Sequence, residues 1–155
     1  MKQPNSKHCF VCGVQNPYGL NLKFYQTGPQ EVTVNYEVPE RYQGYPGVVH
    51  GGIVAAILDE VSGRALMNSG HEDWRFMYTA KMTVRYRKNV PVSEPLRIVG
   101  RALKDKPRLA TAVAIIYNQA GEVLAEAETL LVDLPEDAVS TVDLDALGWQ
   151  VYPDE

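Results

Sequence analysis

Apolar and polar residues alternate along several stretches of the chain, a pattern typical of half-buried β-strands. The alternation is strict over residues 76–87, where one face carries Thr79, Lys81, Thr83, Arg85 and Arg87 and the other carries Tyr78, Ala80, Met82, Val84 and Tyr86. Together with turn-forming residues between the runs, the pattern predicts six strands, over residues 20–25, 32–38, 76–87, 96–104, 110–117 and 123–132.

One segment has helical periodicity instead. From residue 52 to about residue 67 there is no proline, and apolar side chains recur at helical spacing on a stripe formed by Ile53, Ile57 and Val61. This predicts a largely buried helix. A single helix followed by a run of strands predicts an α+β fold, in which one long central helix is wrapped by an antiparallel sheet of five or six strands.

The chain has the length and composition of one domain. Its 155 residues are 45% hydrophobic and 22% charged, which is typical of a soluble globular protein. Residues 1–19 form an N-terminal cysteine-containing segment, and residues 134–155 form an acidic tail with apolar side chains available for packing. No apolar run approaches the roughly 20 residues of a membrane helix, and the N-terminus lacks the apolar segment of a secretory signal. We therefore expect a cytoplasmic protein without membrane association.

Charge is distributed unevenly along the chain, although the net charge is only -4. Residues 81–108 contain nine basic residues and two acidic ones, whereas the chain beyond residue 108 has ten acidic residues and no Lys or Arg. The pattern fits two solvated strand faces of opposite sign, or a basic stretch that meets an anionic ligand. A nucleic-acid partner is disfavoured, because the chain is acidic overall and has no recognition motif.

Two glycines at the predicted helix start and one acidic residue within the helix are the candidate chemistry. Gly51 and Gly52 allow a ligand to approach the backbone, where the first-turn N–H groups have no intrahelical partner and attract developing negative charge. Asp59 lies seven residues after Gly52, nearly two turns, on a face lined with small residues. Glu60 is about 100° away around the helix and is the reserve candidate.

These features belong to a longer pattern. Residues 48–60 read VVHGGIVAAILDE; CFVCG at 9–13, NPYGL at 16–20 and TAKMTVRYR at 79–87 accompany them. In this order the motifs resemble the PaaI-like (phenylacetate-pathway) acyl-CoA thioesterases of the hotdog superfamily. The resemblance implies a hotdog fold, an acyl-CoA substrate, no cofactor, and an active site between the subunits of a homodimer or homotetramer.

The resemblance also implies residue roles. Gly51 and Gly52 would polarise the thioester carbonyl through their N–H groups, and Asp59 would act as general base or nucleophile. Thr79 matches a threonine or serine that assists the attacking group across a subunit interface, and an ordinary strand threonine is an equal alternative. The histidine matching His50 shapes the loop. We expect substrate contacts from His50, Glu60, Arg85, Arg87 and Lys88.

Cys9 and Cys12 do not make a disulfide framework for a chain of this size. Preceded by His8, they would supply half of a zinc site, but a closed structural site usually takes four ligands and no second cysteine pair exists. The sequence therefore favours two reduced cysteines packed near the N-terminal turn, and no metal site.

Two other functions fit the same fold. A non-catalytic hotdog module that binds acyl-CoA or another apolar ligand would keep the cleft without turnover, although an unpaired carboxylate beside an apolar ligand carries a desolvation cost. A hotdog dehydratase or hydratase would require an aspartate and a histidine at a different spacing. The only histidine after the motif is His71, which lies beyond the predicted helix.

Overall fold

The computed structural model describes residues 1–67 and 74–154. Residues 68–71, for which the sequence predicts a loop after the helix, lie outside the described residues. Six antiparallel strands form one sheet in the order β1-β2-β4-β5-β6-β3. The strands are β1 (Tyr25–Gly28), β2 (Glu31–Glu37), β3 (Met77–Tyr86), β4 (Pro95–Lys106), β5 (Leu109–Tyr117) and β6 (Val123–Asp133). A 3-10 turn, η1 (Glu40–Tyr42), precedes the long helix α1 (Gly51–Ala65). The predicted α+β hotdog architecture is confirmed.

Helix α1 lies along one face of the sheet because its apolar stripe is buried there. Val54, Ile57, Leu58 and Val61 are at most 1% exposed. The helix approaches β4 so closely that a Cβ on Gly100 would lie 2.5 Å from the Val61 carbonyl oxygen, so only glycine fits at that position. This contact fixes the distance between the helix and the sheet.

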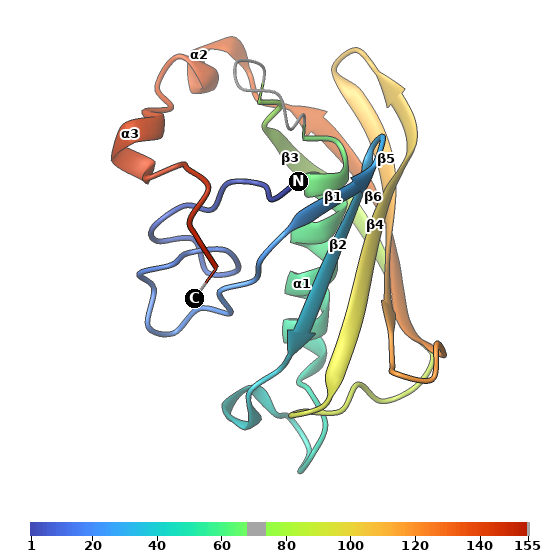
Figure 1. The fold of residues 1–155 in the computed structure, drawn as a ribbon. Helices are drawn as coiled ribbons and strands as arrows, with labels where there is room; N and C mark the ends of the chain where they lie inside the picture. Colours follow the sequence, from blue (N-terminus) through green and yellow to red (C-terminus); the bar gives the residue numbers. More distant parts are fainter. Residues whose placement is uncertain (68–73, 155) are drawn as a thin grey trace.

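A third layer covers the side of α1 that faces away from the sheet (Figure 1). It consists of the N-terminal segment together with the C-terminal segment, which contains the short helices α2 (Glu136–Val139) and α3 (Leu144–Leu147). The two segments are joined by a β-bridge between Asn5 and Gln150. Trp149 packs edge-on against Trp74 and Phe76, with ring centroids 5.9 Å and 5.5 Å apart. No helix in the described parts of the chain is long and apolar enough to cross a membrane.

The prediction of a strand over residues 20–25 is wrong for most of its length. Residues 20–24 are not part of the sheet, and β1 begins only at Tyr25. The alternating Leu20, Leu22 and Phe24 are all buried, but their segment bonds to the N-terminal segment, as in the bond from the Leu22 N–H to the Val11 carbonyl. Burial on one side thus produced a strand-like pattern without a strand.

The strict alternation predicted for residues 76–87 is broken by a β-bulge at Ala80. Thr79 pairs with Leu131 and Lys81 pairs with Leu130, so one residue of β3 has no counterpart on β6. Leu131 is buried on the helix side, and paired residues share a face. Thr79 therefore points toward α1, whereas the alternation had assigned it to the same face as Lys81 and Arg85. The bulge thus turns the Thr79 side chain toward the helix without ending the strand.

Candidate active site

The N-terminus of α1 is exposed and capped by a side chain. His50 is the N-cap residue, and its Nδ1 accepts a hydrogen bond from the Gly52 N–H at 2.9 Å. The Tyr86 hydroxyl donates to the Gly51 carbonyl at 2.7 Å and holds the first turn against β3. The Gly51 N–H makes no hydrogen bond with any residue that the structure describes.

This cap separates the two glycines that the sequence had paired. The Gly52 N–H is occupied by His50, so the Gly51 N–H is the donor left open for a ligand. Because Nδ1 accepts the hydrogen bond from the Gly52 N–H, the ring N–H of His50 lies on Nε2. The geometry therefore gives His50 the task of shaping the helix start.

Asp59 and Thr79 meet on the opposite half of the helix. The Thr79 hydroxyl donates to Asp59 Oδ1 at 2.6 Å, a short bond of the charge-assisted kind. Asp59 is half-buried on α1, and Thr79 reaches it because the bulge at Ala80 turns the side chain toward the helix. Both residues belong to the same chain. The Thr79 hydroxyl bonds to Oδ1 and not to Oδ2 of Asp59.

The Asp59–Thr79 pair lies on the wall of a cavity of about 330 Å³. The cavity runs between α1, the start of β3 and the C-terminal segment. Its apolar lining consists of Met67, Phe76, Met77, Leu131, Leu134, Val142, Leu147 and Trp149. A carboxylate at the edge of a largely apolar cavity is suited to an apolar ligand whose reactive group ends at the carboxylate.

Glu60 faces a different set of groups. Its Oε1 accepts a hydrogen bond from the Arg64 Nε at 3.0 Å, and its carboxylate lies near the thiols of Cys9 and Cys12. The proximity of the two thiols lowers the pKa of Cys12 and, together with burial, raises the pKa of Cys9. Both cysteines are free thiols. These residues line the same 330 Å³ cavity as Asp59.

Two of the three basic residues expected at the substrate lie near the helix start. Arg87 and Lys88 line a second cavity, of about 560 Å³, together with His50, Gly51 and Tyr86. Both cations are exposed, and each is paired with a carboxylate: Arg87 with Glu126 at 2.6 Å, and Lys88 with Glu122. Such exposed pairs are weak, so the cations remain available to a stronger anionic ligand.

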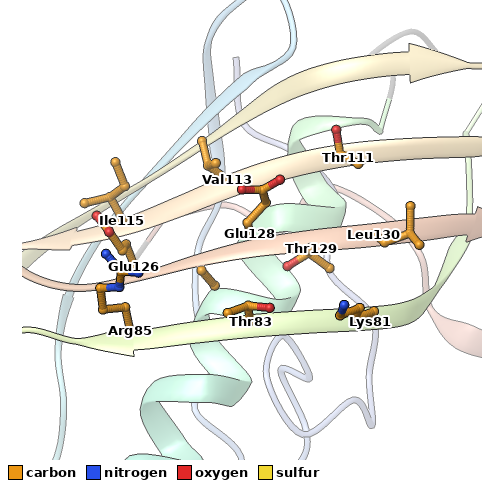
Figure 2. A pocket seen from close by; sticks show the side chains of 11 residues that line it. Lys81, Thr83, Arg85, Thr111, Val113, Ile115, Glu126, Glu128, Thr129 and Leu130 are labelled. Atoms are coloured by element: carbon orange, nitrogen blue, oxygen red, sulfur yellow. The ribbon is translucent and has the colours of Figure 1, made fainter.

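Arg85 lies elsewhere. It lines a cavity on the face of the sheet that points away from α1, beside Lys81 and Thr83 of the same strand and Glu126 and Glu128 of β6 (Figure 2). This position is separated by the sheet from the helix start and from Asp59. The structure does not bring Arg85 together with the other candidate residues.

The candidate residues thus form two groups that are far apart within one chain. Gly51 and Asp59 are eight residues apart on α1, and a rise of 1.5 Å per residue separates them by about 12 Å along the helix axis. A carbonyl must lie about 3 Å from both a donor and an attacking group. One chain therefore does not hold both groups on one carbonyl.

The aromatic side of the 330 Å³ cavity was not expected from the sequence. In the sequence, Trp149 is one of the apolar residues of the acidic tail, and Phe76 is the first residue of a predicted strand. Both are large apolar residues with charged or polar residues nearby in the sequence, which indicates that their side chains pack against the body of the protein. Only the fold shows that the packing partner is the Asp59 region.

Comparison with known proteins gives matches at the level of family and fold. Residues 46–125 match the family model described as Thioesterase superfamily, and this stretch contains Gly51, Asp59 and Thr79. A curated relative, rat acyl-coenzyme A thioesterase THEM4, is 29% identical over 87 residues, which cover 52% of this chain and 36% of the relative. The chain therefore spans little more than a third of that relative's length.

Solved structures share the fold. A thioesterase superfamily protein named RHA08564 superposes with a TM-score of 0.71 at 30% identity, covering 81% of this chain and 63% of that one. Zebra fish thioesterase superfamily member 2 has a TM-score of 0.67 at 24% identity, with coverage of 78% and 89%. Protein smu.793 from Streptococcus mutans, solved bound to acetyl CoA, has a TM-score of 0.66 at 23% identity, with coverage of 74% and 89%. The family model matches more than half of the chain and includes the candidate site, so this chain belongs to the thioesterase superfamily.

Proposed function

We propose that this protein hydrolyses an acyl-CoA thioester to a free acid and CoA, with Asp59 as general base or nucleophile. Support comes from the half-buried Asp59 carboxylate, whose Oδ1 accepts a hydrogen bond from the Thr79 hydroxyl at 2.6 Å on the wall of the 330 Å³ cavity, beside its apolar lining. An unpaired carboxylate beside an apolar ligand costs desolvation energy, so its retention there argues for a chemical role. The acyl group would occupy the apolar part of the cavity.

Two routes are open to Asp59. As general base, it takes a proton from water, the water oxygen bonds to the carbonyl carbon, and the carbon–sulfur bond breaks to release the CoA thiolate, which then takes a proton. As nucleophile, Asp59 attacks the carbonyl carbon and releases the thiolate, and water then hydrolyses the resulting mixed anhydride. In both routes, the Thr79 hydroxyl holds Oδ1 so that Oδ2 faces the reaction.

The oxyanion that forms during attack requires a donor that Asp59's own chain does not bring to it. The open Gly51 N–H supplies such a donor if it comes from the partner subunit, because the two groups are about 12 Å apart within a chain. Strand β3 offers a route to this assembly. It is a ten-residue edge strand that, among the described strands, pairs only with β6, and an exposed edge of this length favours pairing with another strand. We therefore propose a homodimer, or a homotetramer built from two dimers.

The nucleotide end of CoA would lie near the helix start. Arg87 and Lys88 line the same cavity as Gly51, so phosphate groups bound to these cations would anchor the nucleotide end, and the pantetheine arm would have to lead the thioester from there to the Gly51 N–H. The Streptococcus mutans structure of the same fold holds acetyl CoA, in keeping with this ligand class. Arg85, on the outer face of the sheet, is left out of this arrangement.

The proposal is tested by measuring thiol release from a panel of short-chain, long-chain and aromatic acyl-CoA substrates. Turnover of at least one class with kcat/KM in the enzymatic range, about 10⁴ M⁻¹s⁻¹ or more, is expected. Saturable binding of the whole panel without thiol release would instead identify a non-catalytic acyl-CoA binding module.

A further inference from the structure

The cysteine pair of the N-terminal segment is built into a tight turn. The Gly13 N–H closes the turn on the Cys9 carbonyl at 2.8 Å, and a Cβ on Gly13 would lie 2.3 Å from that oxygen, so only glycine permits this path. The turn brings the N–H groups of Val11 and Cys12 to 3.4 Å and 3.5 Å from Cys9 Sγ. Ser6 Oγ lies 3.4 Å from Cys12 Sγ.

Helix α1 brings a third ligand atom to this pair. The sulfurs of Cys9 and Cys12 and a carboxylate oxygen of Glu60 all lie within 4.8 Å of one another. Two thiolates at 2.3 Å from a tetrahedral zinc ion are about 3.8 Å apart, so small side-chain rotations would bring this group into coordination. Glu60 was not among the metal ligands considered from the sequence, because Glu60 lies 48 residues after Cys12.

Charge balance at the cluster fits a bound divalent cation. Arg64 is only 2% exposed and pairs with Glu60 at 3.0 Å. A thiolate-binding metal displaces the thiol protons, so the metal-bound site would carry three negative charges from the two sulfurs and Glu60. The divalent cation and Arg64 together would neutralise them.

We propose that Cys9, Cys12 and Glu60 bind a thiolate-preferring divalent cation of the zinc class, which ties the N-terminal segment to α1. Sulfur ligands select zinc over magnesium or calcium. The N–H groups on Cys9 Sγ and the Ser6 hydroxyl beside Cys12 form the outer layer of hydrogen bonds that such sites use to orient their ligands. All three ligand residues line the 330 Å³ cavity, so water in that cavity would be available as a fourth ligand. This proposal is independent of the thioesterase activity.

The test uses the reduced full-length protein and Zn²⁺ alone, titrated by calorimetry, with Co²⁺ absorbance as a report of thiolate ligation. One Zn²⁺ per chain is expected, with a thiolate-to-cobalt charge-transfer band and a rise in the thermal unfolding midpoint on Zn²⁺ addition. Cys9→Ser should abolish the charge-transfer band or strongly weaken it, together with the thermal shift. Glu60→Gln keeps an acceptor for Arg64 and should weaken Zn²⁺ affinity at least about tenfold. Glu94→Gln, an exposed carboxylate variant outside the cluster, should bind like the parent.

Cys12 lies in the core, and its replacement risks misfolding. The metal site is therefore tested with Cys9→Ser and Glu60→Gln. Absence of saturable binding at one ion per chain would overturn the proposal. So would unchanged affinity in both variants, or a thiol titration showing that the pair forms a disulfide in the presence of Zn²⁺.

Discussion

At the scale of single residues, two adjacent carboxylates, Asp59 and Glu60, are the candidates for the chemistry. Asp59 is held by Thr79 at the edge of the apolar lining, whereas Glu60 is held by Arg64 near the cysteine pair. The positions of Asp59 and Glu60 on the predicted helix identified them as the two candidates. The sequence did not show their partners, because Thr79, Arg64 and the cysteines reach α1 only through the tertiary fold.

The first prediction separates these carboxylates. Asp59→Asn keeps the shape and the bond from Thr79 but removes the base or nucleophile, so kcat for thiol release should fall by at least about 100-fold. Glu60→Gln should lose much less, because Glu60 is turned toward Arg64. A larger loss of kcat in Glu60→Gln than in Asp59→Asn would show that Glu60, and not Asp59, is the catalytic carboxylate.

The second prediction removes one hydrogen-bond donor. Proline is favoured at the first position of a helix, so Gly51→Pro should preserve α1 while deleting the open N–H. The loss of an oxyanion donor should lower kcat by about 100- to 1,000-fold. Gly51→Ala is the matched control: it keeps the N–H, and its Cβ would lie 3.6 Å from the Tyr86 hydroxyl, an ordinary contact. Equal kcat values for the two variants would remove the Gly51 N–H from the mechanism.

At the scale of elements, β3 shows where prediction from sequence ends. Alternation correctly identified the strand over residues 76–87, but it assigned Thr79 to the outer face because nothing in the sequence marks the bulge at Ala80. An extra residue in one strand is defined only against its partner, which is β6. The same reason explains the wrong strand at residues 20–24, whose buried residues pair with an irregular segment.

Other elements were predictable because one local property dominates them. The apolar stripe and absence of proline identified α1 to within two residues at each end. The short helices α2 and α3 were missed, since four residues are too few to show a period.

The third prediction concerns how α1 packs on the sheet. Gly100→Ala forces a Cβ to 2.5 Å from the Val61 carbonyl oxygen and should lower the free energy of unfolding by about 1–3 kcal/mol. Gly63→Ala is the comparison, because its Cβ would meet no atom within 4 Å and alanine favours a helix by up to about 1 kcal/mol. Urea unfolding of both variants measures the difference. If Gly100→Ala were as stable as Gly63→Ala, the close approach of helix and sheet would be incorrect.

At the scale of the whole molecule, the fourth prediction links charge to the ligand. Exposed charge pairs are screened over about 8 Å at physiological ionic strength, so KM for an acyl-CoA should rise with salt if Arg87 and Lys88 bind its phosphates. A pantetheine thioester with the same acyl group lacks the nucleotide phosphates and should show much weaker salt dependence. Identical salt dependence of KM for the two substrates would show that these cations are only solvated surface.

In the proposed enzyme, each active site combines Asp59 of one subunit with the Gly51 N–H of the partner subunit, and mixing two inactive variants tests this arrangement. Asp59→Asn and Gly51→Pro chains, unfolded and refolded together, form mixed dimers in which one of the two sites contains both wild-type groups. Random pairing should therefore restore thiol release to about a quarter of the wild-type rate. Activity no higher than the mean of the two separately refolded variants, with mixed dimers verified by mass spectrometry, would contradict a site shared between subunits.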